Sequence, residues 1–333
     1  MKKLIFLFAL TVIAFATCKK KETQEPASPA VPATPAKLRF VLKLDSTQAR
    51  LDNIGNLSSI PSDHRAQSPR FNSFGAHYIE LAVYDTTGVG RGTVLYITPS
   101  VNTSPVTITT GTNSATYTTS IDFSQLPLKS NGEEIFSVPL SDVKPGNYKW
   151  FRMSVAYQNY DIDYVINSGT TVGSYTFPGN YNGTGTIASF VGYQTYIVSY
   201  VLKKQTVTLN AAKLQGYWGF ESSYTLGSTT YTTTPSQGDG TPGATTVVNP
   251  LFSTSPIPPG SCLVTGQFVN TSQAAQYLTV TGKETSDIVV VVSVSINKSF
   301  EWVEHSGDAA YNPLNGDTVV NMGLRGLIPI IQP

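Results

Sequence analysis

Charge is scarce in this sequence of 333 residues, and that scarcity removes one class of partner. Asp, Glu, Lys and Arg make up only 13% of the chain, while Thr, Ser, Asn, Gly and Tyr are abundant. This usage is typical of an extracellular β protein rather than a cytoplasmic helical one. The formal net charge is +1, so the basic excess that nucleic-acid binding requires is missing. We therefore expect no nucleic-acid partner.

Histidine is equally scarce, with three residues in the whole chain. His64, His77 and His305 lie far apart and show neither the HxH nor the HExxH spacing of common zinc sites. His77 falls in a strand pattern on the same face as Ile79 and Leu81, where we expect a buried packing residue. The sequence predicts no metal-binding histidine motif and no cofactor.

Nucleophile motifs are missing too. There is no Gly-x-Ser-x-Gly, and Cys262 in GSCLVTG has no histidine nearby, so we expect it to be a small buried apolar residue. A glycosidase can build its site from two carboxylates distant in sequence. Asp161, Asp163 and Glu221 lie near aromatic residues and are the candidates, with solvated turn acids as the alternative. We therefore predict no catalytic residue, with a polysaccharide-active enzyme as the alternative.

Residues 1–17 have the layout of a secretory signal peptide. Lys2 and Lys3 form a basic start, residues 4–15 are an apolar run, and Ala16 and Thr17 are small residues at the end. The apolar run is too short to span a bilayer. The sequence therefore predicts export.

The tetrapeptide Phe15-Ala16-Thr17-Cys18 resembles the lipobox of bacterial lipoproteins. The resemblance implies that Cys18 is acylated, with palmitate among its lipids, and becomes the first residue of the mature chain. An ordinary cleaved signal peptide is the alternative. Residues 18–37 then form a lipidated cysteine and a flexible Lys/Glu/Pro-rich tether to the membrane. Stable anchoring requires more than one acyl chain.

The residue after the anchor bears on location. Lipoproteins with Asp at this position stay in the inner membrane, so Lys19 implies the outer membrane by resemblance. The segment KKKETQE also resembles a Lys/Glu-rich signal for surface export, although simple solvation of a tether explains the same charges. The periplasmic face and the cell surface both remain open. A lipidated Cys18 leaves Cys262 single and excludes an internal disulfide.

Period-two alternation recurs along the chain and predicts strands. Leu38, Phe40 and Leu42 share one face of the first strand. The segment SVPLSDVKPGNYKWFRMSVAYQ predicts two strands paired as a hairpin around Pro145-Gly146. The apolar side of its second strand is expected to hold Phe151, Met153, Val155 and Tyr157. Further strands are expected at 77–83, 93–98, 186–191, 193–202, 205–210, 261–269, 277–281, 287–296 and 318–322.

Helical periodicity is nearly absent, with at best a short turn at residues 120–126. We predict an all-β fold, an antiparallel β-sandwich that occupies residues 38–333, with two smaller tandem sandwiches divided near residues 211–215 as the alternative. The run at 288–296 is apolar on both faces and predicts a central strand. Residues 99–119 and 222–259 read as long loops or irregular hairpins.

One loop offers oxygen ligands for a metal ion. In EHSGDAAYNPLNGDTVV, calcium candidates surround a glycine turn at Asp308, Asn312, Asn315 and Asp317. The spacing differs from that of an EF-hand, and Asx turns use the same residues to bond their own backbone. Both interpretations remain open.

Tyrosine is plentiful, with 18 residues in the chain. Tyr160, Tyr164 and Trp218 are candidates for stacking on a sugar or a protein partner, although each also suits ordinary packing in a strand. The body is similar to outer-membrane lipoproteins through stretches such as NKSFEW and DTVVNMGLRGLIP, a resemblance that implies location but no activity. We expect a lipid-anchored binding or interaction protein, with a glycan or another envelope protein as ligand. The alternatives are an adhesin or appendage subunit, and the enzyme above.

Overall fold

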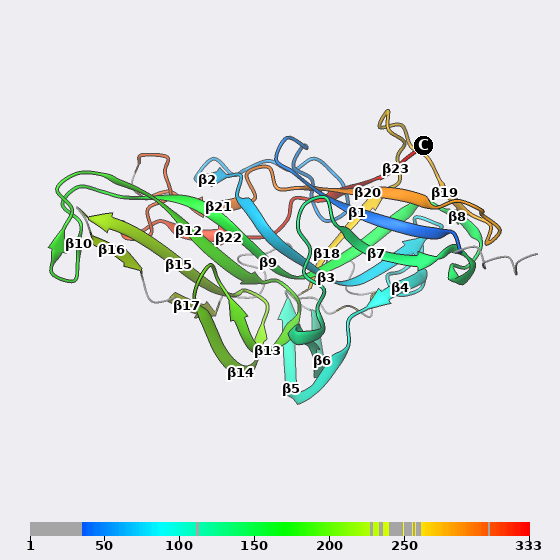
Figure 1. Ribbon diagram of the computed structural model, residues 1–333, viewed down its shortest axis with the longest axis horizontal. Coiled ribbons are helices and arrows are strands. Elements are labelled where there is room, and N and C mark those ends of the chain that lie inside the picture. The colour runs from blue at the N-terminus through cyan, green and yellow to red at the C-terminus, as the bar shows by residue number, and fades with distance from the viewer. Residues whose placement is uncertain are drawn as a thin grey trace, which may run out of the picture. The chain divides into compact units, whose positions relative to one another are not determined.

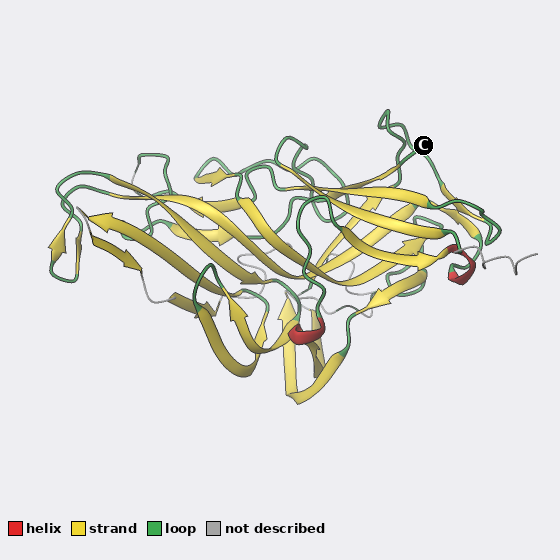
Figure 2. Cartoon of the chain, viewed as in Figure 1, coloured by secondary structure: helices red, strands yellow, loops and turns green. Residues whose placement is uncertain are grey.

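The computed structural model describes residues 35–110, 113–226, 229–232, 236–239, 249, 255, 257, 261–305 and 307–333. The expected signal peptide at 1–17, Cys18 and the tether up to residue 34 lie outside the described residues. Strands dominate the described part, with short 3-10 turns at Phe123–Gln125 and Leu140–Asp142 (Figure 2). The predicted all-β fold is confirmed. No helix in this part is long and apolar enough to cross a membrane.

The largest sheet is organised around β9 (Trp150–Ile166), a strand long enough to pair with several others (Figure 1). β3 (Arg70–Ala82) runs along one side of it. On the other side, β18 (Cys262–Gln267) pairs with the first half of β9 and β12 (Tyr181–Phe190) with the second half. The outer strands are β4 (Thr93–Ile97), β15 (Tyr217–Leu226), β16 (Thr229–Thr232) and β17 (Ser236–Asp239).

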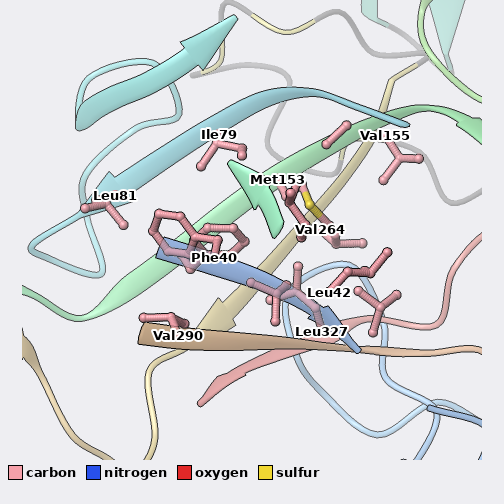
Figure 3. Packing of buried hydrophobic residues seen from close by; sticks show 14 of the residues in the cluster. Phe40, Leu42, Ile79, Leu81, Met153, Val155, Val264, Val290 and Leu327 are labelled. Carbon is pink, nitrogen blue, oxygen red and sulfur yellow. The ribbon is translucent and has the colours of Figure 1, made fainter. Parts of the chain in front are cut away.

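A second sheet packs on the first half of β9. Its order is β23 (Leu327–Ile331), β20 (Ile288–Ser295), β1 (Lys37–Asp45) and β7 (Glu134–Pro139). Figure 3 shows the interface, with Phe40, Leu42 and Val290 of this sheet near Ile79, Met153 and Val264 of the large sheet. The ring centroids of Phe40 and Phe151 lie 5.0 Å apart. β20 lies between β23 and β1, so the prediction of a central strand at 288–296 is confirmed.

Two further layers complete the core. Against the second half of β9 lies a sheet of β2 (His64–Gln67), β21 (Phe300–Val303) and β22 (Thr318–Asn321). The other layer, around Phe190 and Tyr200, is formed by β14 (Thr206–Leu214), β13 (Gln194–Val201), β6 (Asn113–Asp122) and β5 (Ser100–Thr110). Smaller pairs join β8 (Gly146–Tyr148) to β19 (Leu278–Val280) and β10 (Thr171–Val172) to β11 (Tyr175–Thr176).

The two segments expected to be long loops or irregular hairpins differ in outcome. Most of residues 99–119 belong to the β5–β6 hairpin, so the hairpin alternative is confirmed there. Within residues 222–259, the described part continues β15 and adds β16 and β17, which both pair with β15. Residues 211–215, where the alternative of two tandem sandwiches placed its division, include the end of β14.

The predicted hairpin across Pro145-Gly146 is wrong. β7 pairs with β1, whereas β9 pairs with β3, β12 and β18, so the two expected strands belong to different sheets. A turn sequence reverses the chain locally, but the partner of a strand is chosen by where its apolar face is buried. A 3-10 turn at Leu140–Asp142 and the short β8 separate the two strands.

Among the described strands, two pairs are parallel, and the expected antiparallel sandwich did not include parallel pairs. β1 runs parallel to β20, with Leu38 opposite Ile288 and Leu44 opposite Val294, and β13 runs parallel to β6 over a short stretch. Parallel neighbours need a long connection, and the β1–β20 connection includes most of the chain. Local sequence patterns contain no signal for such a pairing.

Irregularities in the β3–β9 ladder overturn two face assignments. The register shifts between Gly75 and Ala76 and again between Ala76 and Tyr78, and each extra residue exchanges the faces of the following side chains. Tyr157 therefore packs in the Phe190 cluster rather than with Phe151 and its neighbours. His77 is turned away from the cluster of Ile79 and Leu81, and its Nε2 lies 2.8 Å from the hydroxyl of Ser154.

Candidate functional site

An apolar cavity of about 320 Å³ lies between the large sheet and the residues around β22. Its floor is formed by β9, β12 and β15, and its opposite wall by Tyr311, Pro313, Leu314, Val319 and Met322. Leu314, one of the residues that line the cavity, is 52% exposed to solvent. The volume falls at the lower end of the range for small-molecule sites, about 300–1,000 Å³. We call this cavity the aromatic pocket; it is lined by Tyr164, Ile166, Val172, Ile187, Trp218, Phe220, Ser222, Tyr224, Tyr311, Pro313, Leu314, Val319 and Met322.

Strand register explains why these side chains converge. Ile187 of β12 lies opposite Tyr160 of β9 and opposite Phe220 of β15, so these three residues form one cross-strand row. Because side chains alternate along a strand, Tyr164 and Ser222 emerge on the same face as this row. Residues distant in sequence thus form one continuous floor.

Two glycines in β12 give the aromatic rings room. A Cβ on Gly183 would come within 2.5 Å of Tyr164 Cζ, and a Cβ on Gly185 within 2.1 Å of Phe220 Cε2. Real Cβ atoms do not approach other atoms this closely. Both rings therefore pack directly against the backbone of a glycine, in space that a side chain would occupy. The rings of Tyr164 and Phe220 then meet edge to face, with centroids 5.9 Å apart. The sequence NGTGT therefore shapes the floor of the pocket.

The aromatic pocket carries no formal charge. Among the described residues, its lining has no Asp, Glu, Lys, Arg or His side chain, and its polar groups are the Ser222 hydroxyl, the Trp218 indole and tyrosine hydroxyls. Burial raises the pKa of Tyr164 above its usual range. Burial also raises the pKa of Tyr311, as does the nearby Asp317 carboxylate. Both phenols therefore stay neutral at physiological pH, which suits an apolar ligand better than an ion.

The three aromatic residues that the sequence offered as binding candidates differ in whether they line the aromatic pocket. Tyr164 and Trp218 line the aromatic pocket, whereas Tyr160 is 1% exposed and packs edge to face on Phe300. The sequence interpretation missed several lining residues, namely Phe220, Tyr224, Ile187 and Tyr311. A usable signal was present, because two glycines in a strand indicate close approach of another group.

The glycosidase candidates act as acceptors of structural hydrogen bonds. Glu221 accepts hydrogen bonds from the backbone N–H groups of residues 203–205 at 3.0–3.3 Å. Asp161 accepts hydrogen bonds from the Thr186 hydroxyl at 2.6 Å and from the Lys203 ammonium at 3.2 Å. Asp163 forms two bonds with Arg70, at 2.7 and 2.9 Å.

These contacts also set the ionisation of the three acids. Burial opposes the charge on Glu221 and Asp161, but their hydrogen bonds outweigh it, so the pKa of each carboxyl is lowered. The Arg70 hydrogen bonds lower the pKa of Asp163. A glycosidase general acid needs a raised pKa. Asp161 and Glu221 both lie opposite Thr186, one position off the Tyr160–Ile187–Phe220 row and therefore on the other face of the sheet.

Two of the calcium candidates, Asp308 and Asp317, accept hydrogen bonds from backbone N–H groups. Asp317 accepts the N–H of His305 at 2.7 Å with one oxygen and the N–H of Asn312 at 2.8 Å with the other, while Asp308 accepts the N–H of Ala310 at 3.0 Å. The Asp308 contact is the Asx turn of the alternative interpretation, whereas Asp317 joins residues more distant in sequence. Both polar atoms of the Asn312 side chain are buried without a hydrogen-bond partner among the described residues. Within the described ranges, no three His, Cys, Asp or Glu residues gather where they would hold a metal ion.

The histidines and Cys262 occupy separate places. His64 Nδ1 lies 2.6 Å from Glu301, which also accepts from Arg50 at 2.7 Å. His77 is buried, and desolvation lowers its pKa to about 3. Cys262 is a buried free thiol at the start of β18, as the sequence predicted, and burial raises its pKa to about 12. None of the three lines the aromatic pocket.

No protein-family model, curated protein or solved structure matches this chain.

Proposed function

We propose that this chain is a lipid-anchored envelope protein that binds a small ligand in the aromatic pocket. The observation that carries the proposal is the pocket: an uncharged cavity of about 320 Å³ whose walls are mostly aromatic and aliphatic. Ligand sites in proteins are concave and mostly apolar, with a few polar groups that orient the ligand. Ser222 and the tyrosine hydroxyls are such groups here.

Binding is favoured over hydrolysis by the state of the acids. Asp161, Asp163 and Glu221 have lowered pKa values and are engaged with Lys203, Arg70 and backbone N–H groups. Asp161 and Glu221 lie on the face away from the aromatic floor. A glycan or an envelope protein remains a suitable ligand if an apolar part of it enters the pocket.

A neutral dye tests the pocket directly. The fluorescence of 1-N-phenylnaphthylamine rises when it enters an apolar site, so titration of the full chain measures its affinity. Ser222→Phe places a ring into the cavity, and we expect the affinity to fall at least tenfold. Ser223→Phe is the matched control, because residue 223 is exposed on the neighbouring position of β15. Equal affinity in both variants would contradict the proposal.

The anchor is tested separately from the pocket. We expect wild-type cells to incorporate radiolabelled palmitate into the protein and Cys18→Ala cells to release it from the membrane fraction. Protease digestion of intact cells then distinguishes the two faces of the outer membrane, with residues 19–22 replaced by alanine as the variant for the surface signal. If the wild-type protein incorporates no palmitate and is released from the membrane fraction, the proposal of a lipid anchor is contradicted.

A second candidate, a structural subunit, is favoured by one sheet edge. β4 lies at the end of the large sheet, where β3 is the one described strand that pairs with it. Val94 and Ile97 on this strand are 39% and 62% exposed, and an open apolar edge can pair with another chain. Sedimentation of the wild type against Ile97→Lys tests this, since assembly through β4 predicts larger species in the wild type only.

A further inference from the structure

The dipeptide Asn-Gly occurs three times in this chain, at residues 131–132, 182–183 and 315–316. Asparagine is a chemically labile residue. Its side-chain amide carbon can be attacked by the backbone nitrogen of the next residue, and a glycine there hinders the attack least because it has no Cβ. All three asparagines are exposed to solvent. Exposure therefore does not distinguish the three pairs, and their hydrogen bonds and backbone must be compared.

The first pair, Asn131-Gly132, has both of its reacting groups engaged by β1. The Asn131 side-chain oxygen accepts the N–H of Leu44 at 2.8 Å, and the N–H of Gly132 donates to the carbonyl of Leu42 at 2.8 Å. The attacking nitrogen has to lose its proton and turn toward the asparagine side chain, which breaks the bond to Leu42. Because breaking these bonds costs free energy, the native structure protects this pair.

The second pair, Asn182-Gly183, lies in a strand. Asn182 is opposite Val165 and Gly183 is opposite Tyr164 in the ladder between β12 and β9. A strand holds the backbone extended, whereas the reaction requires the glycine nitrogen to rotate onto the asparagine side chain. The Tyr164 ring also covers Gly183, since a Cβ there would lie 2.5 Å from Tyr164 Cζ. Reaction at this pair therefore requires the start of β12 to leave its sheet.

The third pair, Asn315-Gly316, lies in the turn before β22. Among the described residues, the Asn315 side chain and the Gly316 N–H have no hydrogen-bond partner. Gly316 has a φ of +95°, and a Cβ added there would meet no atom closer than His305 Cβ, at 3.6 Å. The Gly316 nitrogen can therefore approach the Asn315 side chain without first breaking a hydrogen bond of either group.

We propose that Asn315 is the site at which this protein deamidates in its native state, to a mixture of isoaspartate and aspartate. The Gly316 backbone nitrogen gives its proton to solvent and bonds to Cγ of Asn315, while the bond from Cγ to the side-chain nitrogen breaks and ammonia leaves. One water molecule then opens the resulting succinimide. Attack at the main-chain carbonyl carbon gives isoaspartate, and attack at Cγ gives aspartate.

The modification changes the chain beside the aromatic pocket. Residue 315 follows Pro313 and Leu314, which line that pocket. Either product places a new carboxylate two residues from Asp317, which already accepts the N–H of Asn312, and isoaspartate also lengthens the main chain by one carbon. The inference goes beyond the proposed function and does not depend on it, because the reaction needs only residues 315 and 316 and water.

Peptide mapping by mass spectrometry tests the inference, with the other two pairs as internal controls. The purified full chain is incubated in mildly alkaline buffer, once native and once in guanidinium chloride. Conversion at each asparagine is followed by the mass gained when OH replaces NH2. In the native protein we expect Asn315 to convert at least tenfold faster than Asn131 and Asn182. In guanidinium chloride we expect this difference to disappear, because each pair then lacks its native contacts.

Isoaspartate identifies the route, and a pair of matched variants identifies the residue. An isoaspartyl methyltransferase labels isoaspartate with radioactive methyl groups. We expect Asn315→Gln to lose most of the label that the native wild type acquires, because glutamine closes a larger ring much more slowly, and Asn182→Gln to retain it. A native rate at Asn315 less than tenfold above the other two, or conversion there without isoaspartate, would overturn the proposal. A preference that persists in guanidinium chloride would also overturn it, because local sequence and not the fold would then set the rate.

Discussion

The ring of Phe220 lies against the backbone of Gly185, so that a Cβ added at residue 185 would meet Phe220 Cε2 at 2.1 Å and Cζ at 2.3 Å. β12 and β15 are paired neighbours, and Gly185 faces Ser222 in the register. The ring therefore crosses diagonally over the adjacent strand to reach the glycine. This close approach positions Phe220 in the floor of the aromatic pocket.

Gly185→Ala should displace Phe220 and destabilise the fold. We expect a loss of about 1–3 kcal/mol from overpacking, measured by urea unfolding, together with weaker dye binding. Gly179→Ala is the control, because a Cβ there meets nothing within 4 Å. The added change Phe220→Leu should restore part of the stability lost in Gly185→Ala; additive losses would show that the contact is not the cause.

Glu221→Gln should weaken the turn between β13 and β14. The carboxylate accepts N–H groups from residues 203–205, and bonds to a charged acceptor contribute about 1.5–3 kcal/mol. Because the folded pKa of Glu221 is lowered, this contribution is present above the unfolded pKa and is lost as the pH falls through the folded value. Urea unfolding at pH 7 and pH 3 should show a difference from wild type at pH 7 that shrinks at pH 3. The exposed Asp142→Asn serves as control.

His77 should make the protein sensitive to mild acid. Desolvation lowers its folded pKa to about 3, whereas an unfolded histidine titrates near 6.5. Only the unfolded state gains a proton between these values, so stability falls by about 1.4 kcal/mol per pH unit below about pH 6.5. In unfolding curves between pH 7 and pH 5, His77→Gln should lose this component of the slope. His305→Gln, at an exposed histidine, should retain it.

Cys262 should resist thiol reagents until the protein opens. It is fully buried and burial raises its pKa to about 12, so almost no thiolate exists at pH 8. In a Cys18→Ser background, Ellman's reagent should react with Cys262 only in denaturant, whereas an added Ser223→Cys should react at once in the native protein. Rapid reaction of native Cys262 would contradict its burial.

Local patterns predicted the strands well because side-chain alternation is a property of neighbouring residues. Leu38, Phe40 and Leu42 were expected on one face and are all buried in the core. The apolar run at 288–296 was expected to be central and lies between β23 and β1. Cys262 was expected to be buried and is.

Pairing was predicted less well because it depends on residues distant in sequence. Pro145-Gly146 has the chemistry of a hairpin turn, yet β7 joins β1 and β9 joins a different sheet. An irregularity in the β3–β9 ladder moves Tyr157 to another cluster. No single strand contains the information for either result.

The candidate site shows the same division. Tyr164 and Trp218 were identified from aromatic clusters, but Tyr311 joins them only because the chain after β21 returns over the large sheet. The sequence by itself determined the all-β class, since alternating apolar residues form a buried face only in strands. The tertiary structure decided which faces meet, and therefore where the pocket lies, because burial of one strand's apolar face depends on the faces of all the others.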